Sequence, residues 1–266
     1  KIILSPDLVD LVVFWTKNPE PMMKRIDELG EIPYYIQFTL TGYGRGMEPG
    51  LPDKHELISI FRETAETAGR DHMVWRYDPV LFNERYPAEY HFRAFEAIAE
   101  GICGCTDKVV ISFLDCYGKT KRNMRGIPLE LPDEETMKRT GERFVKTAEK
   151  YGMTVESCAE TVDLSEVGVR HGSCVDPAMI ERILGVPVRV KKDKNQRPEC
   201  GCVESVETGA YDTCLCGCKY CYANDSEGAV MRRREEYDVD SPLLCGRVEE
   251  GDRITVRRTS RILTGE

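Results

Sequence analysis

The stretch Leu8–Trp15, LVDLVVFW, decides the fold that we expect for this chain. An apolar run of this length is typical of a parallel strand that is buried on both faces. Pro19 and Pro21 then favour a helix, MMKRIDELG, that ends at Gly30. A second apolar run, Tyr34–Leu40 (YYIQFTL), follows, and it completes one strand–helix–strand unit.

The same alternation continues for three more strands. We expect strands over Met73–Tyr77, Lys108–Leu114 and Thr154–Ser157, and helices over His55–Ala68, Tyr90–Gly101 and Glu134–Tyr151. Strand and helix repeating in this order predict an α/β fold, with a parallel sheet that closes partly or fully into a TIM-like barrel.

The pattern changes after residue 160, where glycine, cysteine and charged residues dominate. We therefore expect a parallel βα barrel over residues 1–162. Residues 163–266 would then form a cysteine-rich cluster-binding region and a C-terminal tail, both packed on the barrel. Two segments of the tail, Asp240–Leu244 and Asp252–Val256, are candidates for a small β element.

Composition excludes several classes of protein. The 266 residues are 41% hydrophobic and 31% charged, which is ordinary for a globular domain. The net charge of −9 disfavours a nucleic-acid partner, because phosphate neutralisation needs a basic surface. We find neither a signal peptide nor an apolar run of roughly 18 residues, so we expect a cytoplasmic protein with no membrane partner. The first residue is Lys1 rather than Met, and we expect further sequence upstream of it.

Cysteine is the unusual component, since eight of the 12 cysteines lie between Cys158 and Cys221. The segment Tyr211–Asn224, YDTCLCGCKYCYAN, places Cys214, Cys218 and Cys221 at the spacing C-x3-C-x2-C. Three thiolates on one tight loop can hold three irons of a 4Fe–4S cluster and leave the fourth iron open. S-adenosylmethionine (SAM) can chelate that iron through its amino and carboxylate groups, and an electron from the cluster can then break its C–S bond.

Two alternatives to this interpretation remain open. Cys218 and Cys221 form a C-x2-C pair, which also occurs in structural zinc sites. Cys216 lies inside the motif and could be a fourth ligand, which would make a closed electron-transfer cluster. We expect its side chain to point away from the interior of the loop. Gly217 would let the loop turn tightly, and Tyr220 could shield the cluster or pack against the SAM adenine.

A second set of cysteines comprises Cys158, Cys174, Cys200 and Cys202. The set could bind an auxiliary iron–sulfur cluster or a zinc ion, and the alternative is a group of buried free thiols. His171 is a weaker candidate ligand. We expect ordinary thiols at the remaining positions, Cys103, Cys105, Cys116 and Cys245.

Polar residues follow each expected strand, where parallel barrels place their chemistry. They are Thr16 and Lys17, Thr39 and Thr41, Arg76 and Asp78, Asp115, and Glu156, Cys158 and Glu160. Each could also be structural: Lys17 could cap a strand end, and Arg76 and Asp78 could form an ion pair within the barrel. The general acid or base could be any of Asp115, Glu156, Glu160 and the tyrosines.

The cysteine motif and several other stretches resemble those of a known family. The stretches are VVFWTKNPEPM, YYIQFTLTGYG, VWRYDPVLF, ESCAE, HGSCVDP, KNQRPECGCVES and DSPLLCG. They are similar to a family of uncharacterised bacterial and archaeal proteins, a domain of unknown function with a C-terminal cysteine cluster like that of radical SAM enzymes. Members usually carry His at the position of Cys216, which implies that this position is not a required ligand.

A more distant resemblance concerns the barrel. VVFWTKNP, IQFTLTGYGRGMEPGLP and VWRYDPVL look like strands of the radical SAM barrel of spore photoproduct lyase. There the cluster loop follows the first strand, whereas here it follows all the others, so the resemblance implies a permuted barrel. It also implies that Lys17 binds the SAM carboxylate and that Thr39 and Thr41 line the methionine or ribose site. Arg76 and Asp78 would lie beside the SAM pocket.

The function that we expect from these patterns is radical SAM chemistry on an unidentified substrate, with a 4Fe–4S cluster reduced by a donor such as flavodoxin or ferredoxin. The Gly-rich loop Thr41–Pro52 would be a substrate lid. The alternatives are a DNA lesion-repair lyase, an iron–sulfur electron-transfer protein without SAM chemistry, and a zinc-stabilised binding module.

Overall fold

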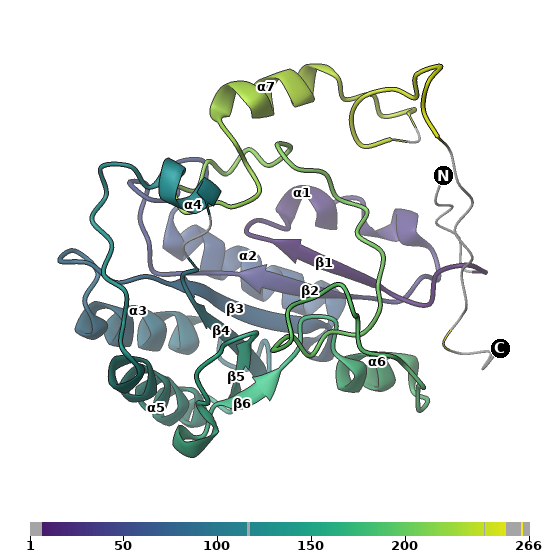
Figure 1. Cartoon of the computed structure of the whole chain (residues 1–266). Helices are drawn as coiled ribbons and strands as arrows, with labels where there is room; N and C mark the ends of the chain where they lie inside the picture. Colours follow the sequence, from purple (N-terminus) through teal and green to yellow (C-terminus); the bar gives the residue numbers. More distant parts are fainter. Residues whose placement is uncertain (1–6, 116–117, 242, 254–261, 263–266) are drawn as a thin grey trace.

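The computed structural model describes residues 7–115, 118–241, 243–253 and 262, and its centre is a parallel β-sheet (Figure 1). Six strands pair in the order in which they occur along the chain, and every pair is parallel. They are β1 (Val12–Thr16), β2 (Tyr34–Thr39), β3 (Met73–Val80), β4 (Lys108–Phe113), β5 (Thr154–Cys158) and β6 (Arg170–Gly172). The predicted α/β class and parallel sheet are confirmed, and β6 extends the sheet beyond the five strands that the sequence predicts.

Helices connect the strands and continue after the sheet. The α-helices are α1 (Glu20–Met23), α2 (Lys54–Ala68), α3 (Ala88–Gly101), α4 (Gly118–Asn123), α5 (Glu134–Lys150), α6 (Pro177–Leu184) and α7 (Glu227–Glu235). Short 3-10 helices are η1 (Ile26–Leu29), η2 (Arg70–His72) and η3 (Ser165–Val167). The single helix expected up to Gly30 is therefore divided into α1 and η1. At the start of α2, the Asp53 carboxylate accepts hydrogen bonds from the N–H groups of His55 and Glu56.

One face of the sheet packs against α2, α3 and α5 and forms the main core. Phe38 stacks on Phe61 of α2 with ring centroids 5.0 Å apart. The rings of Phe95 of α3 and Phe144 of α5 stack at 4.2 Å, and Trp75 of β3 lies against Phe95. These side chains are fully buried, so this face supplies most of the apolar burial that stabilises the fold.

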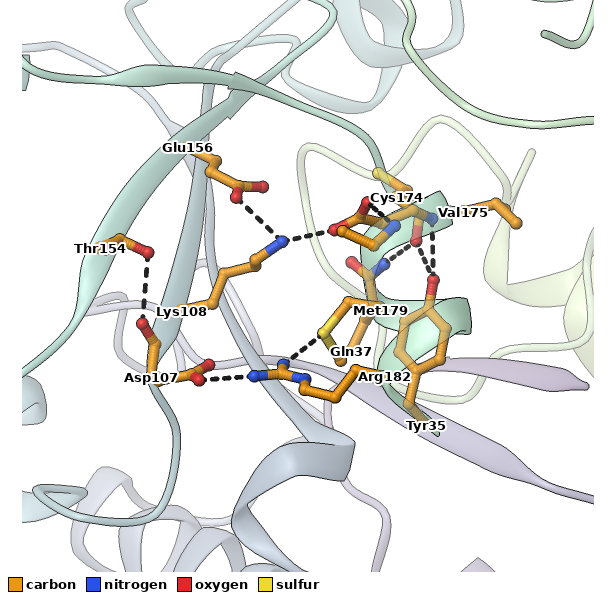
Figure 2. A network of polar contacts seen from close by, with 12 residues as sticks. Tyr35, Gln37, Asp107, Lys108, Thr154, Glu156, Cys174, Val175, Met179 and Arg182 are labelled. Atoms are coloured by element: carbon orange, nitrogen blue, oxygen red, sulfur yellow. Dashed lines mark hydrogen bonds and ion pairs between the residues drawn. The ribbon is translucent and has the colours of Figure 1, made fainter. Parts of the chain in front are cut away.

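The opposite face of the sheet is more polar, and the chain after β6 folds back across it. In α6, Met179 packs with Val74 and Val110 of this face. Lys108 of β4 reaches two carboxylates, with its Nζ 2.9 Å from Glu156 and 2.6 Å from Asp176 (Figure 2). Ion pairs and apolar contacts thus fix the cysteine-rich region against the sheet.

In the described part of the C-terminal tail, the regular structure is the helix α7. Two segments were candidates for a β element. Their described parts, residues 240, 241, 243, 244, 252 and 253, contain no strand, and Pro242 and residues 254–256 lie outside the described residues. Across the part of the chain that the structure covers, none of the helices combines the length and hydrophobicity needed to cross a membrane.

Candidate functional site

The loop that carries Cys214, Cys218 and Cys221 lies against the Gly-rich loop that follows β2. Two backbone hydrogen bonds join the loops: Gly50 N–H donates to the Cys216 carbonyl at 3.0 Å, and Lys219 N–H donates to the Met47 carbonyl at 2.9 Å. A Cβ atom at Gly50 would lie 2.5 Å from the Leu215 carbonyl oxygen, so this approach requires glycine. The Gly-rich loop, expected to be a substrate lid, thus supports the cysteine loop at the carboxyl end of β2.

Glu48, which the sequence analysis did not single out, is the centre of this contact. Its side chain is 1% exposed, and its Oε1 accepts from Lys17 Nζ at 2.9 Å and from Thr41 Oγ1 at 2.8 Å. Its Oε2 lies 2.5 Å from Lys54 Nζ, and the Tyr220 hydroxyl also donates to Oε1. Burial alone would raise the pKa of Glu48, but the two ammonium groups lower it to about 2. One feature of the sequence could have identified Glu48: it is the only acidic residue in the sequence of the Gly-rich loop, Thr41–Pro52.

This network sets the positions of three predicted SAM-binding residues. Lys17 pairs with Glu48 and lies 5.3 Å from the centroid of the Tyr220 ring. Thr41 is fully buried and its hydroxyl donates to Glu48, so it supports the network. Tyr220 is buried against Tyr43, with ring centroids 5.6 Å apart, so it anchors the loop. Another predicted residue, Thr39, is half-buried in β2 opposite Arg76 of β3.

The cysteine loop is also held by two asparagines. Asn224 Nδ2 donates to the Cys214 carbonyl at 2.7 Å. Asn123 of α4 donates through Nδ2 to the carbonyls of Cys221 and Asn224, both at 2.9 Å. These bonds fix the backbone of the loop on both sides of the motif and leave the thiols outside this backbone network. The sequence analysis missed both asparagines.

The thiols of the motif influence one another. Burial, together with the charges of Cys214 and Cys221, raises the pKa of Cys218 to about 11, while Lys17 acts in the opposite direction. A hydrogen bond between the thiols of Cys214 and Cys216 lowers the pKa of Cys214 to about 6. The Cys216 carbonyl accepts from Gly50 N–H, and its half-buried side chain packs against the main core and the apolar cluster that contains Tyr43 and Tyr220.

The second set of cysteines is brought together from three segments. Cys158 ends β5, Cys174 follows β6, and Cys200 and Cys202 lie in the loop after α6. Sγ of Cys158 is 3.0 Å from Sγ of Cys174, and the thiol of Cys202 interacts with those of Cys174 and Cys200. His171 is exposed and is not part of these contacts. Across the described ranges, no three Cys, His, Asp or Glu side chains already surround a common metal position.

Buried polar side chains of the sheet support Cys174. Its carbonyl accepts hydrogen bonds from the Tyr35 hydroxyl and from Gln37 Nε2, both on β2 (Figure 2). Arg76 Nη1 lies 2.8 Å from the Cys174 sulfur and 2.8 Å from Gln37 Oε1. Arg76 also pairs with Asp78, so the two residues form the structural ion pair that the sequence analysis kept as an alternative.

Carboxylates gather at the ends of β3, β4 and β5. Asp78 accepts from Ser112 Oγ at 2.8 Å, and Asp115 pairs with Arg197 at 2.6 Å. Glu160 accepts from Phe113 N–H at 2.7 Å and lines a cavity of about 200 Å³. Burial, with the nearby charges of Asp115 and Asp78, raises the pKa of Glu160 to about 7. A carboxyl group with this pKa can both donate and accept protons near neutral pH.

Comparison with known proteins identifies the family of this chain. No curated protein matches this chain. One solved structure, a candidate alpha-L-fucosidase from Bacteroides thetaiotaomicron, matches 58% of the chain at 14% sequence identity and a TM-score of 0.28, and the match spans 66% of that protein, just under two thirds. The family described as "Domain of unknown function (DUF1848)" matches residues 1–223, which include both sets of cysteines. The chain therefore belongs to this DUF1848 family, which agrees with the uncharacterised family that its sequence motifs resemble.

Proposed function

We propose that this protein is a radical SAM enzyme that acts on an unidentified substrate, with a 4Fe–4S cluster held by Cys214, Cys218 and Cys221. We further propose that its parallel sheet is a permuted barrel of the radical SAM type, in which the cluster-binding loop comes after the strands. The observation that carries the proposal is the seating of the C-x3-C-x2-C loop on the carboxyl end of the sheet through Gly50 and Glu48.

The residues present fit a cluster of this kind. They supply three thiols on one loop, within a span of eight residues from Cys214 to Cys221. When bound, a reduced 4Fe–4S cluster supplies the electron that cleaves SAM. The network around Glu48 fixes the loop that carries these thiols, and the asparagine contacts fix its ends.

Lys17 is the best candidate to bind the SAM carboxylate. Its ammonium is held by Glu48 beside the cysteine loop, while 16% of its side chain stays exposed. Arg76 and Asp78, on β3, would lie beside the SAM pocket. Glu160 is the best candidate to hold or move a proton on a substrate, because its pKa is near neutral and it lines a cavity. A low-potential donor such as flavodoxin or ferredoxin would supply electrons.

A second candidate function is supported by Cys216. It lies within the motif and lowers the pKa of Cys214, so four cysteines could close the cluster and exclude SAM. The protein would then transfer electrons without radical chemistry. A DNA lesion-repair lyase is a narrower form of the first proposal, and the net charge of −9 argues against it.

One experiment separates these functions. The full chain is reconstituted without oxygen, its iron and sulfide are counted, and the reduced protein is mixed with SAM. We expect about four irons per chain and release of 5′-deoxyadenosine. Cys218→Ala should lose the iron, whereas Cys216→Ala and the control Cys103→Ala, at an exposed thiol outside both sets, should keep it. Loss of the iron in Cys216→Ala, with no SAM cleavage by the wild-type protein, would establish the electron-transfer alternative.

A further inference from the structure

We propose that Cys158, Cys174, Cys200 and Cys202 form a second metal site, which binds a single zinc ion through four thiolates. This inference does not depend on SAM chemistry, because it concerns a separate set of side chains at the ends of β5 and β6.

The spacing of the sulfur atoms favours one metal ion over the other arrangements. The distance of 3.0 Å between the sulfurs of Cys158 and Cys174 is too long for a disulfide bond of about 2.05 Å. Two thiolates on a tetrahedral zinc, each about 2.3 Å from the metal, are about 3.8 Å apart. Sulfurs that each bind a different iron of a cubane cluster are much farther apart than this. The separation of Cys158 and Cys174 is therefore nearer to that of two ligands of one ion than to that of ligands on different irons.

The four cysteines belong to one cluster of packed side chains. Within it, Sγ of Cys158 lies 3.0 Å from Sγ of Cys174, and the N–H group of Cys174 lies 3.2 Å from the Cys202 sulfur. Two of the four sulfurs are already held by other groups. The N–H group of Val175 also donates to the Cys202 sulfur, at 3.3 Å, and Arg76 Nη1 donates to the Cys174 sulfur at 2.8 Å.

The surroundings of the site supply the support that a thiolate–metal centre needs. Four thiolates and one Zn²⁺ carry a net charge of −2, which the guanidinium of Arg76, 2.8 Å from the Cys174 sulfur, partly balances. The Cys174 backbone is held by Tyr35 and Gln37. A Cβ atom at Gly201 would lie 3.2 Å from the Gly172 carbonyl oxygen, so the glycine lets the loop with Cys200 and Cys202 approach β6 closely.

The burial of the site indicates a structural role for the ion. Cys200 and Cys202 are buried with Val175, Ile180 and Val203 in a small apolar cluster. Four protein ligands leave no position for water or substrate, which is the pattern of structural zinc. The ion would join the end of the sheet to the loop after α6, a segment in which the described residues form neither helix nor regular strand.

The test is metal analysis of the full chain. In a Cys214→Ala/Cys218→Ala/Cys221→Ala background, which removes the first cluster, we expect about one zinc per chain and no iron. Cys202→Ser and Cys174→Ser should weaken zinc binding by more than the about 10–100-fold that second-shell changes cause, and Cys103→Ser should not change it. In the otherwise wild-type chain, Cys202→Ser should leave the iron of the first cluster in place.

A second measurement uses the unaltered protein, so it tests the proposal even when the variants fail to fold. A chelator strong enough to remove zinc should expose these four thiols to alkylation, which mass spectrometry locates residue by residue. Two outcomes would overturn the proposal: equal alkylation of the four thiols with and without the chelator, or iron and sulfide in the triple-alanine background that disappear with Cys202→Ser. Neither depends on whether the protein cleaves SAM.

Discussion

Lys17, directly after the first strand, lies 2.9 Å from Oε1 of Glu48, in the loop after the second strand, and this carboxylate also receives the hydroxyl of Tyr220 from the cysteine motif. The pair thus connects the start of the sheet to a loop that the chain forms about two hundred residues later.

Glu48→Gln should destabilise the protein. The substitution leaves Lys17 and Lys54 without their shared carboxylate in a buried position, and we expect the free energy of unfolding to fall by about 3 kcal/mol. Urea denaturation followed by circular dichroism measures the change. Glu20→Gln is the control. The Glu20 carboxylate is 44% exposed and pairs with Lys24, so its loss should lower the free energy of unfolding by less than about 1 kcal/mol. Equal effects of the two substitutions would contradict the role given to Glu48.

The same carboxylate predicts a dependence of stability on pH. Its pKa is about 2 in the folded protein and 4.5 ordinarily, so the folded state favours its charged form. Its contribution is complete above pH 4.5 and is lost as the pH falls from 4.5 toward 2. We therefore expect the difference in unfolding free energy between wild type and Glu48→Gln to shrink over this range. A difference that stays constant over the same interval would be evidence against the buried pair.

The raised pKa of Glu160 should make stability depend on pH in the opposite direction. Its pKa is raised from 4.5 to about 7, so the folded protein keeps a proton that the unfolded chain has already released. Wild type should lose stability relative to Glu160→Gln as the pH rises from 4.5 to 7. Thermal unfolding across this range measures the trend, with Glu135→Gln on the exposed surface of α5 as the control. Parallel curves for wild type and Glu160→Gln would show that the carboxyl group titrates normally.

Gly50→Ala should displace the cysteine loop. The new methyl group would lie 2.5 Å from the Leu215 carbonyl oxygen and 2.9 Å from that of Cys216, both of them backbone atoms. We expect a destabilisation of about 1–3 kcal/mol and a lower iron content after reconstitution. Gly44→Ala is a matched control in the same Gly-rich loop, because a Cβ atom there meets nothing within 4 Å. An iron content that is the same in both variants would mean that the loop contact does not support the cluster.

Arg76→Gln tests the support of the second metal site. The substitution removes the guanidinium that lies 2.8 Å from the Cys174 sulfur and that also pairs with Asp78. We expect zinc affinity to fall by about 10–100-fold while the iron content stays unchanged. Competition with a chromophoric chelator measures the affinity. If zinc is bound as tightly by the variant as by wild type, Arg76 serves only its ion pair with Asp78.

The sequence predicted the elements that have a clear hydrophobic pattern. The strands β1 and β2 were expected from apolar runs such as Tyr34–Leu40, and β3, β4 and β5 from their alternation with helical segments. The strand β6 is only Arg170–Gly172, and its first two residues are exposed, so it has no such pattern. It forms because its backbone pairs with that of β5.

The candidate site was predicted less completely, for a related reason. Cysteine spacing is local, so both sets of cysteines could be found from the sequence. Lys17 and Tyr220, two of the partners of Glu48, are 31 and 172 residues away from it along the chain. The partners of Asn123 are 98 and 101 residues away, and nothing in the local sequence shows these distant partners. Only packing of the two loops brings these side chains into contact.

The position of Cys214, Cys218 and Cys221 after all six strands has a consequence for biosynthesis. A ribosome adds about 5–20 residues per second, so the sheet and its helices are complete for several seconds before these cysteines leave the exit tunnel. The newly made chain can then fold its scaffold, including the receiving loop with Gly50 and Glu48, before any iron is delivered. Assembly of the proposed cluster would be a late step on a preformed surface, and folding of the sheet would not depend on metal.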